Sequence, residues 1–109
     1  MNVDILKSKS IQLDPDVFEV RVHGNLVTLT ADQFDLLEAL MLRFGRVMTR
    51  QQIVKESKGE DYPCTDKAVD VAIHHLRKKI PRELIEAVRG RGYRFVERVT
   101  KMPATAEVL

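Results

Sequence analysis

The segment between Thr65 and Ile80 carries side chains suited to binding nucleic acid, spaced so that they share one side of a helix. At about 100° per residue, that side gathers Lys67, Val71, His74, His75 and Lys78. Lysine neutralises phosphates, and side chains on an exposed helix contact base edges in the major groove. The spacing therefore predicts a helix that binds double-stranded DNA.

Val71 is an apolar residue in the middle of this polar side. An exposed apolar side chain gains nothing from water, but in the major groove it can contact thymine methyl groups. The alternative is that Val71 packs under the preceding loop as part of the core. The helical spacing favours the groove contact and leaves the alternative open.

His74 and His75 could bind a metal, contact DNA or be merely solvated. Adjacent helical residues diverge by about 100°, so their rings do not converge easily on one ion. No His, Cys or carboxylate lies four residues after either of them. We therefore predict no metal and no other cofactor, and we expect contacts with bases or phosphates.

The run Arg89-Gly90-Arg91-Gly92 follows this helix. It lacks the third glycine of the dinucleotide fingerprint, and no Gly-Lys-Ser/Thr follows as in a phosphate-binding P-loop. Two arginines at a hairpin tip suit a narrow minor groove, where the negative potential is strongest. The alternative is a turn whose glycines supply positive φ and whose arginines are only solvated.

Positive charge is concentrated in the last third of the chain. Residues 66–98 contain nine Lys/Arg against five Asp/Glu, whereas residues 1–65 contain eight against ten. Such asymmetry is typical of a surface that binds a polyanion. There is no HExxH motif, nucleophile elbow or paired carboxylates outside polar turns, so we expect no enzymatic activity.

The length of 109 residues suits one domain with one core. We predict a folded domain over residues 1–98 and a flexible tail over residues 99–109. Cys64 is the only cysteine, which excludes an internal disulfide. No apolar run approaches the ~20 residues of a membrane span and no signal peptide begins the chain, so we expect a cytoplasmic protein with no membrane segment.

The elements that must position these side chains begin with a small antiparallel sheet. Short β-favouring runs separated by turn residues predict strands over residues 3–6, 11–13, 17–22 and 26–29. Phe18, Val20 and Val22 alternate with charged residues, so their side chains are expected to be buried. Gly24-Asn25 is predicted to form the hairpin turn.

Three helices follow. Thr30 with Gln33 and Thr49 with Gln52 each form the capping-box pattern that begins a helix. The first helix is expected to direct Phe34, Leu37, Leu40, Met41 and Phe44 inward, and the second Ile53 and Val54. The third begins near Thr65 or Asp66 and is ended by Pro81. Residues 85–88 and 93–96 are predicted to form the hairpin.

Two stretches carry a resemblance to a known family: LTADQFDLLEALMLRFGRVMTRQQIV (29–54) and KAVDVAIHHLRKKI followed by VRGRGYRF (67–95). Together they resemble the winged-helix DNA-binding (effector) domain of OmpR/PhoB-family response regulators. The resemblance implies an α+β fold, a winged helix-turn-helix with an N-terminal four-stranded antiparallel sheet, three helices and a C-terminal β-hairpin wing. It also implies a sequence-specific bacterial transcriptional regulator, with the third helix in the major groove and the wing in the minor groove.

The family's contacts can be carried over by position. The base-facing positions are Lys67, Val71, Ala72 and His75, joined by His74 from the helical spacing. The minor-groove positions are Arg89 and, as an added charge, Arg91. The phosphate-facing positions are Thr49, Arg50, Arg77, Lys78 and Tyr93. The loop that contacts RNA polymerase in activators corresponds to residues 58–65, with Lys58, Glu60, Asp61 and Tyr62.

Several positions depart from the family pattern. Ala72 replaces a common histidine, His74 and His75 replace residues that are often basic, and Lys58 replaces a common tryptophan. No receiver domain is expected before Ile5. The family further implies a free monomer that binds DNA as a head-to-tail dimer. Two alternatives stay open: a protein-interaction module that contacts RNA polymerase or another partner, and the cytoplasmic DNA-binding part of a membrane-anchored regulator.

Overall fold

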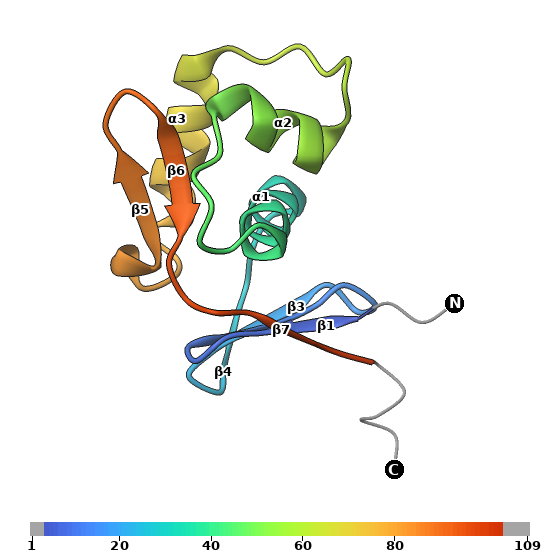
Figure 1. Ribbon diagram of the computed structural model, residues 1–109. Coiled ribbons are helices and arrows are strands. Elements are labelled where there is room, and N and C mark those ends of the chain that lie inside the picture. The colour runs from blue at the N-terminus through green and yellow to red at the C-terminus, as the bar shows by residue number, and fades with distance from the viewer. Residues whose placement is uncertain (1–3, 104–109) are drawn as a thin grey trace.

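The computed structural model of the protein describes residues 4–103. Three helices lie on one side of a sheet, and a separate hairpin lies beside the third helix (Figure 1). The strands are β1 (Ile5–Lys7), β2 (Ile11–Asp14), β3 (Glu19–Val22), β4 (Asn25–Val27), β5 (Ile85–Val88), β6 (Gly92–Phe95) and β7 (Thr100–Met102). The helices are α1 (Ala31–Leu42), α2 (Arg50–Lys58), α3 (Asp66–Leu76) and the 3-10 turn η1 (Arg82–Leu84). This arrangement confirms the predicted winged-helix architecture.

The N-terminal sheet has five strands, one more than predicted. Its order is β4-β3-β2-β1-β7, and β7 pairs antiparallel with β1 through Ile5↔Met102 and Lys7↔Thr100. The predicted flexible tail therefore begins with ordered structure. Val99 is buried, and the strand that follows it pairs with β1. Residues 104–109, the rest of that tail, lie outside the described residues.

Glu97 fixes the chain just before β7. Its carboxylate accepts hydrogen bonds from the Ser8 hydroxyl at 2.7 Å, the Ser10 hydroxyl at 2.7 Å and the Ser10 backbone N–H at 2.9 Å. Burial alone would raise the pKa of Glu97, but the hydrogen bonds from Ser10 and Ser8 outweigh it and hold that pKa below its ordinary value. The contact joins the end of the wing to the β1–β2 turn.

The prediction that the side chain of Phe18 is buried was wrong. Phe18 has a φ of 54° and is 70% exposed. The turn after β2 covers residues 15–18, so the alternation starts only at Glu19, and Val20 is buried as predicted. The ring of Phe18 lies edge-on against Phe34 at a centroid distance of 5.2 Å.

The β3–β4 turn also differs from the prediction by one residue. Val22 pairs with Asn25, so His23 and Gly24 form the two-residue loop. Both have positive φ, 50° and 84°, which is the requirement of a type I′ hairpin turn.

Both predicted capping boxes are present. The Thr30 and Thr49 hydroxyls accept from the backbone N–H groups of Gln33 and Gln52, whose side chains accept from the threonine N–H groups in return. The first helix ends at Leu42, so Phe44, predicted to point inward, is exposed. The buried side chains Leu37, Leu40, Met41, Ile53, Ile73, Leu76 and Phe95 form the centre of the core between helices, sheet and wing.

The third helix is one turn shorter than predicted. It ends at Leu76, residues 77–79 form turns, and Pro81 precedes η1. Val69, Ile73, Leu76 and Ile80 are nevertheless buried as the spacing predicted. Among residues 4–103, no helix is long and apolar enough to cross a membrane.

Candidate nucleic-acid interface

The predicted row of side chains on α3 lies on its exposed side. Thr65 caps the helix by accepting from the Ala68 N–H at 3.1 Å, and Val69, Ile73 and Leu76 bury the opposite side. The exposed row consists of Lys67, Val71, His74 and His75 on the helix and of Lys78 in the turn that follows it. Val71 is 45% exposed, so the alternative that it packs in the core is excluded.

Ala72 does not belong to that row. It is half-buried and packs against the core beside Val69. On a helix it lies about 100° from Val71, on the side that faces α1 and α2. This position does not favour the base contact that was predicted for Ala72.

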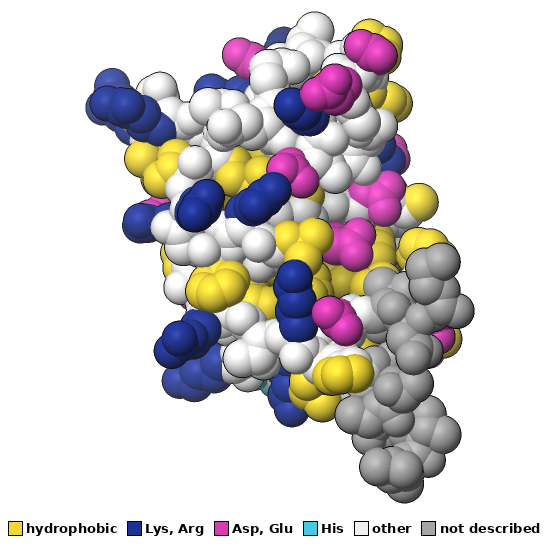
Figure 2. Space-filling model, turned by 45° about the vertical axis from the view of Figure 1, so that its right-hand side comes forward, with side chains coloured by type: hydrophobic (Ala, Val, Ile, Leu, Met, Phe, Trp, Pro, Cys, Tyr) yellow, Lys and Arg dark blue, Asp and Glu magenta, His cyan; other side chains and the backbone are white. Residues whose placement is uncertain are grey.

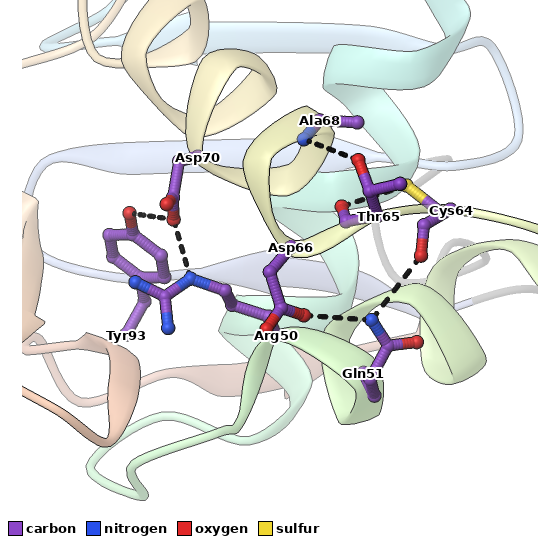
Figure 3. Close-up of polar contacts among 8 residues, drawn as sticks. All are labelled: Arg50, Gln51, Cys64, Thr65, Asp66, Ala68, Asp70 and Tyr93. Atoms are coloured by element: carbon purple, nitrogen blue, oxygen red, sulfur yellow. Dashed lines mark hydrogen bonds and ion pairs between the residues drawn. The ribbon is translucent and has the colours of Figure 1, made fainter.

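Arg50, Asp70 and Tyr93 join α2, α3 and β6 at one point (Figure 3). Asp70 Oδ1 accepts from Arg50 Nε at 2.7 Å and from the Tyr93 hydroxyl at 2.6 Å. The Arg50 guanidinium carbon also lies 5.9 Å from the centroid of the Tyr93 ring. Two residues predicted to contact phosphates are thus held together by a carboxylate.

The ionisation of this cluster follows from its hydrogen bonds. The bond from Arg50, followed by that from Tyr93, holds the pKa of Asp70 below its ordinary value. The same contact with Asp70 raises the pKa of Arg50. Burial, together with the bond to Asp70, raises the pKa of Tyr93. Asp70 and Arg50 are therefore both charged at neutral pH.

Asp70 was not among the predicted site residues. The predicted contacts are made by basic and groove-reading side chains, and an aspartate carries the charge that phosphates repel. A signal was present, since Asp70 lies three residues after Lys67 and four before His74, next to the exposed row. A second link between α2 and α3 comes from Gln51, which donates to Asp66 Oδ1 at 2.9 Å and to the Cys64 carbonyl at 3.3 Å (Figure 3).

The wing presents its two arginines at its tip. Residues 89–91 connect β5 to β6, with Gly90 at a φ of 72° and the Arg91 N–H donating to the Val88 carbonyl at 2.9 Å. Arg89 and Arg91 are both exposed. Lower on the wing, Arg94 pairs with Glu86 across the strands. Among residues 4–103, the charged side chains of this hairpin that have no ion-pair partner, Arg89 and Arg91, are therefore at its tip.

The base of the wing is joined to the link between α1 and α2. Met48 and Tyr93 exchange backbone hydrogen bonds of 2.8 Å and 3.0 Å. At Gly92 the backbone approaches so closely that an added Cβ would lie 1.9 Å from the Met48 carbonyl oxygen. The first residue of β6 must therefore be glycine.

The remaining predicted phosphate contacts lie at the ends of helices. Thr49 is exposed but its hydroxyl already accepts from the Gln52 N–H. Arg77 follows α3 and its Nε donates to the Arg82 carbonyl at 3.4 Å, while Lys78 is exposed in the next turn. Thr49 and Tyr93 thus have structural partners, and Lys78 extends the exposed row.

The predicted polymerase-contact loop divides into an engaged and an exposed part. Lys58 ends α2 and pairs with Asp32 and Asp35 of α1, contacts that raise its pKa. Glu60 pairs with Lys55 at 2.8 Å. Asp61 and Tyr62 are exposed. Lys58 therefore joins two helices by charge.

Charge is unevenly distributed over the surface. In Figure 2 most Lys and Arg side chains lie toward the left of the view and most Asp and Glu side chains toward the right. Within residues 4–103, no three His, Cys, Asp or Glu side chains are grouped as a metal site would require.

The sequence of this chain matches a protein family and known relatives. A family model described as transcriptional regulatory protein, C terminal, matches residues 24–95. The sensory transduction protein RegX3 of Mycobacterium tuberculosis is 39% identical over 101 residues, which cover 87% of this chain and 44% of RegX3. The chain thus spans less than half the length of this curated relative.

Solved structures give the same picture. The RstA DNA-binding domain of Klebsiella pneumoniae, crystallised with its RstA box, superposes with a TM-score of 0.74 at 35% identity, covering 84% of this chain and 96% of that domain. The response regulator DrrB of Thermotoga maritima, an OmpR/PhoB homologue, superposes with a TM-score of 0.74 at 25% identity, covering 84% of this chain and 44% of DrrB.

Proposed function

Because this chain belongs to the family of transcriptional regulatory protein C-terminal domains, the winged-helix DNA-binding domains of OmpR/PhoB-type response regulators, we propose how its own residues contact DNA. In this proposal α3 enters the major groove, where Lys67, Val71, His74 and His75 face bases. The wing places Arg89 and Arg91 in the adjacent minor groove. Arg50, Arg77 and Lys78 bind phosphates on either side.

One observation carries this proposal. The exposed row of α3 contains an apolar side chain, Val71, flanked by basic and polar ones, and the free charges of the wing lie at its tip. A surface that bound only phosphates would need no apolar side chain at its centre, whereas thymine methyl groups give Val71 a partner. We further propose that the chain acts in the cytoplasm, where a bacterial chromosome lies, and that it has no catalytic role.

The proposal is tested by separating base contacts from phosphate contacts. The chain would first select 30-base-pair duplexes from a random library, and the enriched duplex would be the probe. Lys67→Ala should relax the preference at one or two base positions, because it removes a base contact. Lys78→Ala should weaken binding to all duplexes alike and make the salt dependence shallower by about one unit.

Lys101→Ala is the matched control, since it removes the same charge from β7 in the sheet. With ~6 phosphates contacted per copy, log K of the unmodified chain should fall with log salt at a slope near −5. Binding that ignores salt, or that Lys101→Ala weakens as much as Lys67→Ala does, contradicts the proposal. Failure to enrich any duplex would instead favour the protein-interaction alternative.

Two further parts of the proposal concern assembly and transcription. We propose that the free chain is a monomer and that two copies bind direct repeats head to tail, as the family implies. Sedimentation with one and with two half-sites measures this directly.

We also propose that Asp61 and Tyr62 contact RNA polymerase, because both are exposed next to α3. Changing both to alanine should reduce transcription in vitro while leaving DNA affinity unchanged.

A further inference from the structure

Asp70 places a negative charge beside the proposed DNA-binding row. It lies one helical turn from Lys67 and from His74, and its side chain is 42% exposed. A carboxylate at this place repels phosphates, so its direct effect on DNA binding is unfavourable. Its contacts indicate an indirect effect of the opposite sign.

Those contacts hold the other two elements of the interface. One oxygen of Asp70 accepts both the Arg50 Nε–H of α2 and the Tyr93 hydroxyl of β6, at 2.7 Å and 2.6 Å. Hydrogen bonds to a carboxylate are shorter and stronger than neutral ones. The Asp70 carboxylate thus joins α2, α3 and the wing at one point (Figure 3).

The way Asp70 holds Arg50 leaves most of the guanidinium available. Guanidinium has five N–H donors, of which Nε–H is one. Within residues 4–103, no hydrogen bond occupies either Nη group of Arg50. The side chain of Arg50 is 33% exposed, and its guanidinium also lies near the Tyr93 ring. An arginine held in this way has lost rotamer freedom before it meets a ligand, which favours a bidentate contact with phosphate.

We propose that Asp70 is a positioning residue for DNA binding. It acts through Arg50, whose Nη groups it directs toward a backbone phosphate, and through Tyr93, which fixes the wing relative to α3. It does not itself contact DNA. This inference rests on the proposed function. It adds a residue that favours DNA binding although its own negative charge repels phosphates.

The sign of the effect distinguishes positioning from simple charge. Asp66 provides the matched control, because it lies on the same helix and close enough to Arg50 to influence its pKa, but hydrogen-bonds with Gln51 instead. Asp70→Asn and Asp66→Asn each remove one negative charge from α3. If only charge mattered, both variants would bind the enriched duplex more tightly.

Positioning predicts that the two variants diverge. Asp66→Asn should bind as tightly as the unmodified chain or more tightly. Asp70→Asn should bind about five- to tenfold more weakly, with a salt slope shallower by about 0.9 because one phosphate contact is lost. Asp70→Asn combined with Arg50→Ala should be at most about two- to threefold weaker than Arg50→Ala alone, since the Arg50 contact is already lost and only the hydrogen bond from Tyr93 remains to be removed.

Tyr93→Phe tests the wing half of the inference without changing charge. It should weaken binding about two- to threefold, the effect of one hydrogen bond, and leave the salt slope unchanged because Arg50 keeps its phosphate. Asp70→Glu keeps the carboxylate and should recover part of the affinity lost in Asp70→Asn. Urea unfolding of each variant confirms that the fold is intact, and Tyr93→Phe and Asp70→Glu decide the matter if Asp70→Asn does not fold.

The outcomes separate this inference from the function on which it rests. If the unmodified chain binds no duplex, both the proposed function and the positioning role are wrong. If the chain binds DNA but Asp70→Asn binds as tightly as Asp66→Asn, only the positioning role is wrong. A weaker Asp70→Asn variant with an unchanged salt slope and a loss additive with Arg50→Ala also overturns it, because the effect would then be structural.

Discussion

Two hairpins in this protein have similar length but opposite environments. The β3–β4 hairpin lies at one edge of the sheet, and all three residues of β4 are exposed or half-buried. In the β5–β6 wing, Ile85, Tyr93 and Phe95 are buried, and the backbone also pairs with Met48. The tips differ as well, with His23-Gly24 on one and Arg89-Gly90-Arg91 on the other.

The difference shows how a hairpin can be both rigid and available for binding. The wing is fixed at its base by the core, by Met48 and by the contact of Tyr93 with Asp70. Its tip carries charges that no fold contact needs. A projection fixed in this way loses little entropy when it binds. In the β3–β4 hairpin only Val20 is buried, and its strand β4 forms an edge of the sheet.

Removing the buried base of the wing should give the largest effect. Phe95 is fully buried in the core, so Phe95→Ala should lower the free energy of unfolding by about 3–5 kcal/mol. Leu26→Ala, in the exposed strand β4, should change it by less than about 0.5 kcal/mol. Urea denaturation measures both. Similar losses for the two variants would break the comparison.

The glycines of the two hairpins should respond differently to the same substitution. In Gly92→Ala the new Cβ meets the Met48 carbonyl, and the φ of 141° is itself unfavourable, so we expect a loss of about 2–4 kcal/mol. In Gly24→Ala only the φ of 84° is unfavourable, because nothing lies within 4 Å, and about 1 kcal/mol is expected. Thermal melting of the two variants measures the ratio.

Gly92 also illustrates what the sequence could and could not predict. The helix starts were predictable because each capping box joins residues three apart, as in Thr30 and Gln33. The hairpin at residues 85–96 was predictable from its turn residues. Gly92 was read as part of the turn, whereas its role in the strand depends on Met48, which lies far away in the sequence.

Two of the misses share this cause. The fifth strand pairs Ile5 with Met102, and no pattern of neighbouring residues predicts a partner so distant in the sequence. Asp70 was missed because its partners lie 20 and 23 residues away, on α2 and β6. Val71 was assigned correctly to the exposed side because helical spacing alone decides it. The capping boxes and the exposed side of α3, which depend on one element, could thus be predicted, whereas the contacts that join elements could not.

Glu97 joins the end of the wing to the β1–β2 turn of the sheet, and this connection depends on pH. A carboxylate whose pKa is lowered in the folded state stabilises it above the ordinary value of 4.5, and this contribution is lost as the pH falls through the lower folded value. Glu97→Gln should therefore lower the free energy of unfolding by about 1–2 kcal/mol at pH 7 and flatten its decline below about pH 4.5. Glu19→Gln in β3, whose carboxylate lies 3.9 Å from Arg21, should change either quantity little. Urea unfolding at several pH values tests this, and an unchanged acid slope in Glu97→Gln would contradict it.

The smallest expected effect compares one arginine from each hairpin. Arg89→Ala should weaken binding to the enriched duplex about five- to tenfold, close to 1 kcal/mol, because it removes a minor-groove contact. Arg21→Ala removes the same charge from β3, in the sheet on the far side of α1 (Figure 1). Charges separated by more than ~8 Å are largely screened at physiological salt, so Arg21→Ala should stay within about twofold of the unmodified chain.

The base composition of the probe sharpens this last comparison. An arginine in a narrow minor groove gains most over A·T tracts, where the negative potential is strongest. Replacing an A·T tract that flanks the major-groove site with G·C pairs should therefore weaken the unmodified chain and leave Arg89→Ala nearly unaffected. If Arg89→Ala responds to the replacement as strongly as the unmodified chain does, the tip arginine does not enter the groove. The wing would then act on phosphates alone, and its rigid base would serve only the fold, as the β3–β4 hairpin does.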